Sequence, residues 1–113
     1  MPFGKVFRAI LLALFCVTAL PVFAQDIKVG QAIAEKLCAR CHAIISGQKS
    51  KHGLAPTFPA IANRYSVWGL QEALAEGIIV GHADMPKFTF SPAEINNLLA
   101  YMDTFTRKKG SAQ

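Results

Sequence analysis

The chain has 113 residues, of which 52% are hydrophobic and 17% are charged, and its formal net charge is +5. That length supports one small domain and excludes a multidomain enzyme. The basic residues are scattered and form no stripe interleaved with aromatic side chains, which excludes a dedicated nucleic-acid-binding surface.

The first 24 residues contain the excess of hydrophobic residues and have the features of a secretory signal peptide. Lys5 and Arg8 precede a twelve-residue apolar run. In Val22-Phe23-Ala24, a β-branched and a small residue occupy the two positions that a signal peptidase recognises. The alternative, an uncleaved membrane anchor, would need about 18–20 apolar residues. We therefore expect a signal peptide at residues 1–24, cleaved after Ala24, and one exported domain at residues 25–113.

A helix followed by a loop is predicted at the start of this domain. Asp26 can cap a helix over residues 26–41, in which apolar residues recur at helical spacing. Glycines and prolines, among them Pro56 and Pro59, indicate a loop over residues 43–64.

Two further helices are predicted after this loop. Residues 66–76 form a short helix that stops at Gly77. Residues 91–94, Ser-Pro-Ala-Glu, form a capping box with proline at the first helical position. The helix that follows carries an apolar stripe made of Ile95, Leu98, Leu99, Met102 and Phe105, and residues 107–109 close it with positive charge. No segment alternates as a strand, so the predicted fold class is all-α.

The most informative motif is Cys38-Ala39-Arg40-Cys41-His42. Cys16 belongs to the leader, so Cys38 and Cys41 form a pair in an exported domain, where a disulfide is one interpretation. A thioredoxin-like dithiol would need a βαβ context, and a zinc site would need four ligands. C-x-x-C-H is the signature of covalent haem c attachment. We therefore predict one haem c, covalently bound through Cys38 and Cys41, with His42 as a ligand of its iron.

An electron-transfer haem needs a second axial ligand, and the domain offers Met85, Met102, His52 and His82. Met102 belongs to the apolar stripe of the last helix, and His52 lies among lysines in a loop. Met85 precedes Pro86 in a non-helical stretch that can present the thioether to the iron, and His82 is its main rival. We predict Met85 because of this context. A thioether ligand would raise the reduction potential relative to a second nitrogen ligand.

From about Lys28 to Phe105 the chain resembles the class I c-type cytochromes, small soluble bacterial monohaem carriers related to mitochondrial cytochrome c. The resemblance rests on Gly30 eight residues before Cys38, the Cys38–His42 motif, Pro56, Met85-Pro86 and Leu98-Leu99-Ala100-Tyr101. It implies a cytochrome c fold in which the N- and C-terminal helices cross at Gly30 and Tyr101, with short middle helices and loops wrapped around one haem.

The same resemblance implies roles for residues around the haem. The carbonyl of Pro56 is expected to accept the ring N–H of the proximal His42, a bond that orients the ligand. Arg64 is similar in spacing to an arginine that binds a haem propionate. Further contacts with the cofactor are implied for Trp68 and Tyr65 at the propionates and for Phe58, Leu70 and Leu98 in the crevice.

The function predicted from these features is that of a periplasmic single-electron carrier and not an enzyme, since both axial positions of the iron are filled. Two alternatives remain: a cytochrome c subunit of a dehydrogenase or oxidase complex, and a ligand-binding or peroxidatic haem protein if Met85 is not a ligand. The expected partners are redox proteins, a donor dehydrogenase or cytochrome complex and an acceptor oxidase or reductase. We expect a monomer that docks at most transiently on membrane complexes. Two interpretations remain for the charge of Lys36, Lys49, Lys51 and Lys87: steering toward acidic partners, and dispersed charge that keeps the protein soluble.

Overall fold

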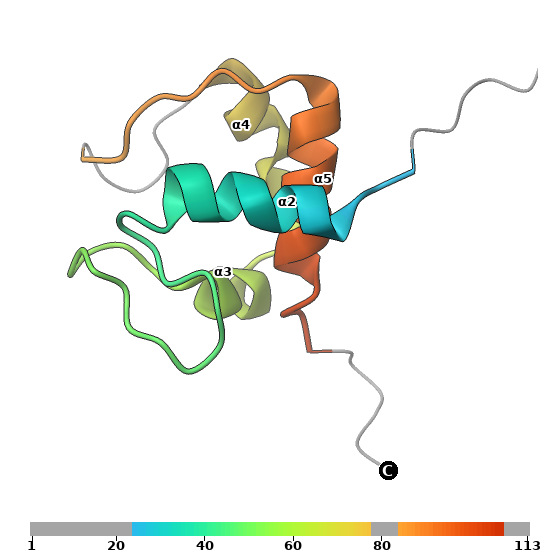
Figure 1. The fold of residues 1–113 in the computed structure, drawn as a ribbon. Helices are drawn as coiled ribbons and strands as arrows, with labels where there is room; N and C mark the ends of the chain where they lie inside the picture. Colours follow the sequence, from blue (N-terminus) through green and yellow to red (C-terminus); the bar gives the residue numbers. More distant parts are fainter. Residues whose placement is uncertain (1–23, 78–83, 108–113) are drawn as a thin grey trace, which may run out of the picture.

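Residues 24–77 and 84–107 are described by the computed structural model, whose regular secondary structure is helical (Figure 1). The elements are α2 (Ile27–Ile33), the π-helical turn η1 (Ala34–Cys38), α3 (Phe58–Arg64), the 3-10 turn η2 (Val67–Leu70), α4 (Gln71–Glu76) and α5 (Pro92–Asp103). These two ranges contain no strand, which confirms the all-α prediction. No helix within them is long and apolar enough to cross a membrane. Residues 1–23 of the predicted leader, His82, and Lys108 and Lys109 lie outside the described residues.

The first helix begins where the sequence predicts, because Asp26 caps it. The Asp26 carboxylate accepts hydrogen bonds from the backbone N–H of Lys28 at 2.9 Å and from that of Val29 at 3.1 Å. These are two of the donors that the first turn of a helix leaves without a partner. A side-chain cap therefore fixes the start of α2.

The end of this first helical segment differs from the prediction. The helix expected over residues 26–41 stops at Cys38, and its last turn, η1, is π-helical. The N–H of Ala39 donates to the carbonyl of Ala34, five residues back, at 2.9 Å. A π turn holds one residue more than an α turn, and apolar spacing over so few residues does not distinguish the two.

The crossing of the N- and C-terminal helices is confirmed, and Gly30 makes it possible. α2 runs across α5 (Figure 1), and a Cβ placed on Gly30 would overlap the backbone carbonyl of Asn97 on α5. The side chain of Asn97 also accepts a hydrogen bond from the backbone N–H of Asp26 at 2.8 Å. The two backbones thus touch at a position that only glycine can occupy.

α3 lies within the stretch that the sequence predicted as a loop, so that prediction was wrong over residues 58–64. The Thr57 hydroxyl accepts a hydrogen bond from the N–H of Ala60 at 3.1 Å and caps this helix. Pro59 falls in its first turn, where the missing N–H of proline costs nothing. The prolines that suggested a loop therefore mark a helix start.

The later helices follow the prediction more closely. Residues 67–76 form η2 and α4, and α4 is capped at its end by Gly77, whose φ of 68° lies in the left-handed region that favours glycine. α5 starts at the predicted capping box, in which Ser91 and Glu94 bond reciprocally. The hydrogen bond from the Ser91 backbone N–H, with that from its hydroxyl, lowers the pKa of the Glu94 carboxyl.

The end of α5 corrects a second detail, since the helix stops at Asp103 and Arg107 lies beyond it. Thr104 and Thr106 cause this ending. The Thr104 hydroxyl donates to the Tyr101 carbonyl at 2.6 Å, and the Thr106 hydroxyl donates to the Asp103 carboxylate at 2.9 Å. Such local side-chain bonds compete with the continuation of a helix.

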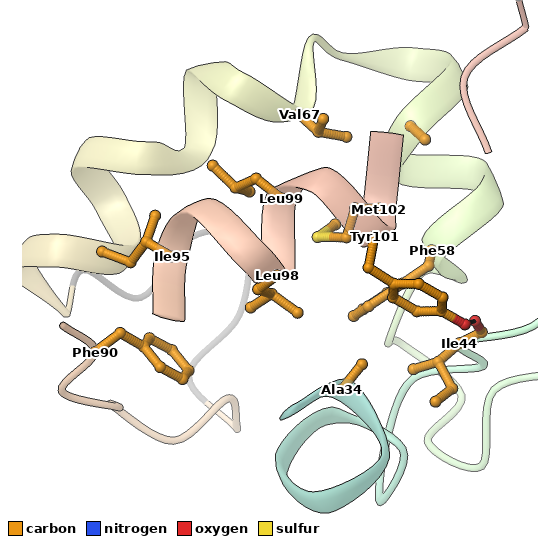
Figure 2. Packing of buried hydrophobic residues seen from close by; sticks show 11 residues of the cluster. Ala34, Ile44, Phe58, Val67, Phe90, Ile95, Leu98, Leu99, Tyr101 and Met102 are labelled. Atoms are coloured by element: carbon orange, nitrogen blue, oxygen red, sulfur yellow. Dashed lines mark hydrogen bonds between the residues drawn. The ribbon is translucent and has the colours of Figure 1, made fainter. Parts of the chain in front are cut away.

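The hydrophobic core is built around α5, which supplies the buried Ile95, Leu98, Leu99, Tyr101 and Met102 (Figure 2). The other elements add Ala34, Ile44, Phe58, Ala62, Val67 and Phe90. Tyr101 is the polar member of this cluster, and its hydroxyl donates to the Ile44 carbonyl at 2.7 Å. Burial, and then the negative charge of Glu35, raises the pKa of Tyr101. The bond ties the loop after the cysteine motif to α5.

Replacing Tyr101 with phenylalanine tests the strength of this tie. The change keeps the ring but removes the donor from the Ile44 carbonyl, and a buried polar group without its partner costs about 1–3 kcal/mol. We expect the free energy of unfolding to fall by that amount, measured in urea by circular dichroism. An unchanged urea midpoint at an unchanged m-value would contradict the proposed stabilisation.

Candidate functional site

A cavity of about 430 Å³ lies between α5, α3, α4 and the loops that flank them. Its volume falls within the range of roughly 300–1,000 Å³ typical of small-molecule and cofactor sites. Most of the side chains around it are apolar. The lining residues are Cys38, His42, Leu54, Pro56, Phe58, Ala60, Ile61, Arg64, Tyr65, Leu70, Ala73, Leu74, Met85, Leu98 and Met102.

The structure brings most of the predicted site residues to this one cavity. Nine of the eleven line it: Cys38, His42, Pro56, Phe58, Arg64, Tyr65, Leu70, Met85 and Leu98. Cys41 is half-buried beside the motif but is not among the lining residues. Trp68 is not among them either, and its indole N–H donates to the Asp103 carboxylate at 3.3 Å.

The cysteine motif forms a tight turn after the end of η1. The backbone N–H groups of Cys41 and His42 both donate to the Cys38 carbonyl, at 3.1 and 2.9 Å. No disulfide joins the two half-buried cysteines, and burial raises the pKa of the Cys38 thiol to about 11. A reactive dithiol needs the opposite shift, toward a stable thiolate, so this environment does not suit thioredoxin-like chemistry.

The imidazole of His42 is held in one orientation by the loop that contains Pro56. Its Nδ1–H donates to the Pro56 carbonyl at 2.6 Å, which is the contact expected from the sequence. With the proton on Nδ1, the lone pair of Nε2 is available to a metal. The loop is closed by a hydrogen bond from the Phe58 N–H to the Ala43 carbonyl at 2.8 Å, and the Phe58 ring lies 5.9 Å from the His42 ring.

The two methionine candidates for the second ligand both line the cavity. Met85 is half-buried on the segment before α5, whereas Met102 is buried on α5 within the core cluster. His52 does not line the cavity, and its ring is paired with Asp84 at 3.3 Å. His82 lies outside the described residues.

The donor set and the walls of the cavity fit a haem. The motif offers two thiols, and the cavity offers one imidazole and thioether sulfur, all of which are groups found in haem attachment and axial ligation. Arg64 at the end of α3 supplies a cation for the propionate carboxylates, and the apolar walls suit the porphyrin faces. In the described part of the chain, no three His, Cys, Asp or Glu side chains cluster as a metal site would require.

The sequence did not identify several lining residues: Leu54, Ala60, Ile61, Ala73 and Leu74. Ala60 and Ile61 were missed because α3 was predicted as a loop. Leu74 follows Leu70 by one helical turn on the apolar side of the helix predicted over residues 66–76, but only Leu70 was assigned to the haem crevice. Leu54 is 69% exposed in an irregular loop, and no periodic signal marks it.

Comparisons with known proteins point the same way as the site. A protein family described as cytochrome c oxidase, cbb3-type, subunit III matches residues 25–102. Cytochrome c-552 from Bradyrhizobium diazoefficiens is 32% identical over 79 residues, which cover 70% of this chain and 74% of that protein. No solved structure matches the chain.

Proposed function

This chain belongs to the c-type cytochromes, in the family described as cytochrome c oxidase, cbb3-type, subunit III. We therefore propose that it is a periplasmic single-electron carrier with His42 and Met85 as axial ligands. It is an electron-transfer protein with covalently bound haem c, not an enzyme. The observation that carries the ligand assignment is the 2.6 Å hydrogen bond from His42 Nδ1–H to the Pro56 carbonyl. That bond leaves Nε2 as the free donor of a residue that lines the cavity.

The attachment step in this proposal uses the cysteine pair. Cys38 and Cys41 are the thiols that bond to the haem, and the turn that joins them places His42 directly after the second thiol. The bound haem supplies the one-electron iron couple, and the protein supplies binding, orientation and a dry environment. Phe58 and Leu98 are buried beside the cavity and exclude water from it.

Met85 is proposed to bind the iron on the side opposite His42. Its thioether lines the same cavity as His42, and a methionine ligand favours reduced iron over oxidised iron. Arg64 is proposed to hold a propionate by a charge-assisted hydrogen bond. The indole N–H of Trp68 donates to the Asp103 carboxylate, and a contact of its ring with the haem stays a prediction.

Replacing Met85 with alanine tests the second ligand. We expect the variant to lose the weak red methionine–ferric band completely, to become high-spin and to bind carbon monoxide when reduced. Met102→Leu is the matched control, because that sulfur lines the same cavity and should be replaceable without spectral change. Loss of the band in Met102→Leu instead would assign the ligand to α5, and a band that survives in Met85→Ala would exclude Met85.

Export and processing are part of the proposal. The family match begins at residue 25, which supports a signal peptide at residues 1–24 and a haem domain at residues 25–113. Cleavage would remove Lys5 and Arg8 and lower the net charge of the mature chain. The periplasm is then the compartment in which the domain works.

The family description favours a second candidate, permanent residence in an oxidase complex. The chemistry at the iron would be the same, but docking would be stable. Size-exclusion chromatography of a native extract separates the two, because a free carrier elutes as a small monomer. The exposed side chains of Lys36, Lys49, Lys51 and Lys87 support association with an acidic redox partner in either case.

A further inference from the structure

His52 joins the segment that carries the cysteine motif to the segment that carries Met85. Its backbone N–H donates to the Cys41 carbonyl at 3.2 Å, and its own carbonyl accepts from the Ala55 N–H at 3.1 Å. Its ring Nε2 lies 3.3 Å from Oδ2 of Asp84. The loop after η1 and the segment before α5 extend to the same side of the molecule (Figure 1), and this contact connects them.

The ring of His52 is oriented by a second bond. Nδ1 accepts a hydrogen bond from the backbone N–H of Leu54 at 3.2 Å, so the ring proton resides on Nε2 in the neutral imidazole. Nε2–H is therefore the donor toward the Asp84 carboxylate. The contact needs no positive charge on His52, because the neutral tautomer satisfies both partners.

Asp84 is the residue directly before Met85, and Pro86 follows. Because the two residues are adjacent, only a few torsions separate the Asp84 carboxylate from the Met85 side chain. Pro86 restricts the backbone of Met85 to extended conformations. On the other side of Met85, Phe90 is buried and its ring lies 5.6 Å from that of Phe88. Met85 thus lies between two anchored points of its segment.

From these contacts we propose that His52 is a positioning residue that holds the Met85 segment over the cavity through Asp84. The proposal rests on the ligation by Met85 proposed above. His52 does not touch the iron in this arrangement. It limits how often the segment lifts and carries the thioether away from its place opposite His42.

The experiment measures the rate at which added imidazole displaces methionine in the ferric holoprotein, followed by loss of the methionine–ferric band far from denaturing conditions. The contact is a single polar pair at a partly exposed position, where such contacts are weak, so His52→Ala should raise the rate about two- to fivefold. Asp84→Ala should raise it equally, and the double variant should add nothing further. His52→Gln keeps a neutral donor near Asp84 and should restore most of the wild-type rate.

Lys51→Ala is the matched control, because Lys51 is the exposed neighbour of His52 in the same loop. A purely structural role for His52 would leave the exchange rate unchanged, would make the two alanine effects additive, or would show no rescue by glutamine. Any of these results overturns the positioning role while the ligation proposal stands. A wild-type protein without the methionine band overturns the ligation proposal itself, and the role of His52 with it.

Discussion

The Gly30→Ala variant is expected to lose about 3 kcal/mol or more of its free energy of unfolding, because the added methyl group has no space. A Cβ at this position would overlap the Asn97 carbonyl and lie 3.0 Å from the Cβ of Tyr101. The first obstacle is backbone, so no side-chain rotation relieves it and the two helices must separate. Over-packing of this kind typically costs about 1–3 kcal/mol, and more where the surroundings are rigid.

The measurement is urea unfolding of the holoprotein, with Gly69→Ala as the matched control. Gly69 is also helical, in η2, and a Cβ there would meet no heavy atom within 4 Å beyond its chain neighbours and the backbone of its own turn. Its replacement should be neutral or stabilising by up to about 1 kcal/mol, since alanine restricts the unfolded chain. Equal losses in both variants would mean that helix crossing is not the cause.

The Cys38→Ser, Cys41→Ser double variant is expected to carry no covalent haem. Its band on a denaturing gel should not stain for haem, whereas each single variant should still stain because one thioether is retained. Serine keeps the size of the side chain but has no thiol to bond to the porphyrin. A double variant that still stains would exclude attachment through this motif.

The same double variant is expected to be much less stable than the wild-type holoprotein. A bound cofactor stabilises the folded state through its binding free energy, and the residues around a cavity of about 430 Å³ would lose their contacts with it. Thermal unfolding followed by circular dichroism measures the difference. A melting temperature equal to that of the wild-type holoprotein would show that the haem is not an important part of the core.

The features that could be predicted from the sequence are those with a local cause. The capping box at Ser91 and Glu94, the cap at Asp26 and the stop at Gly77 each depend on residues within a few positions. The motif at residues 38–42 is local too, and its spacing carried the prediction of the cofactor. These signals predicted the starts of α2 and α5, the end of α4 and the all-α class, whereas most of the cavity lining was implied by the family resemblance.

The features that could not be predicted depend on distant contacts or on ambiguous signals. Proline is common both in loops and in first helical turns, so Pro59 did not reveal α3 until Thr57 was seen to cap it. Trp68 was assigned to the haem by resemblance, but its indole N–H is bonded to Asp103, 35 residues further along the chain. The contact between His52 and Asp84 joins two loops with no periodic pattern.

The π-helical turn η1 lies between Gly30 at the helix crossing and the cysteine pair. It sets the direction of the cysteine side chains around the helix axis relative to that of Gly30. Each residue of an α-helix advances the direction of the side chain by about 100°, and a π turn contains one residue more than an α turn. If residues 34–38 formed a regular α turn with no residue removed, everything after them would rotate by roughly 100° relative to Gly30. The cysteine pair would then face a different side of the molecule, although every helix kept its length of backbone hydrogen bonding. The π turn thus accommodates one extra residue between Gly30 and the cysteines. It thereby sets the direction in which the cysteine pair points relative to the helix crossing.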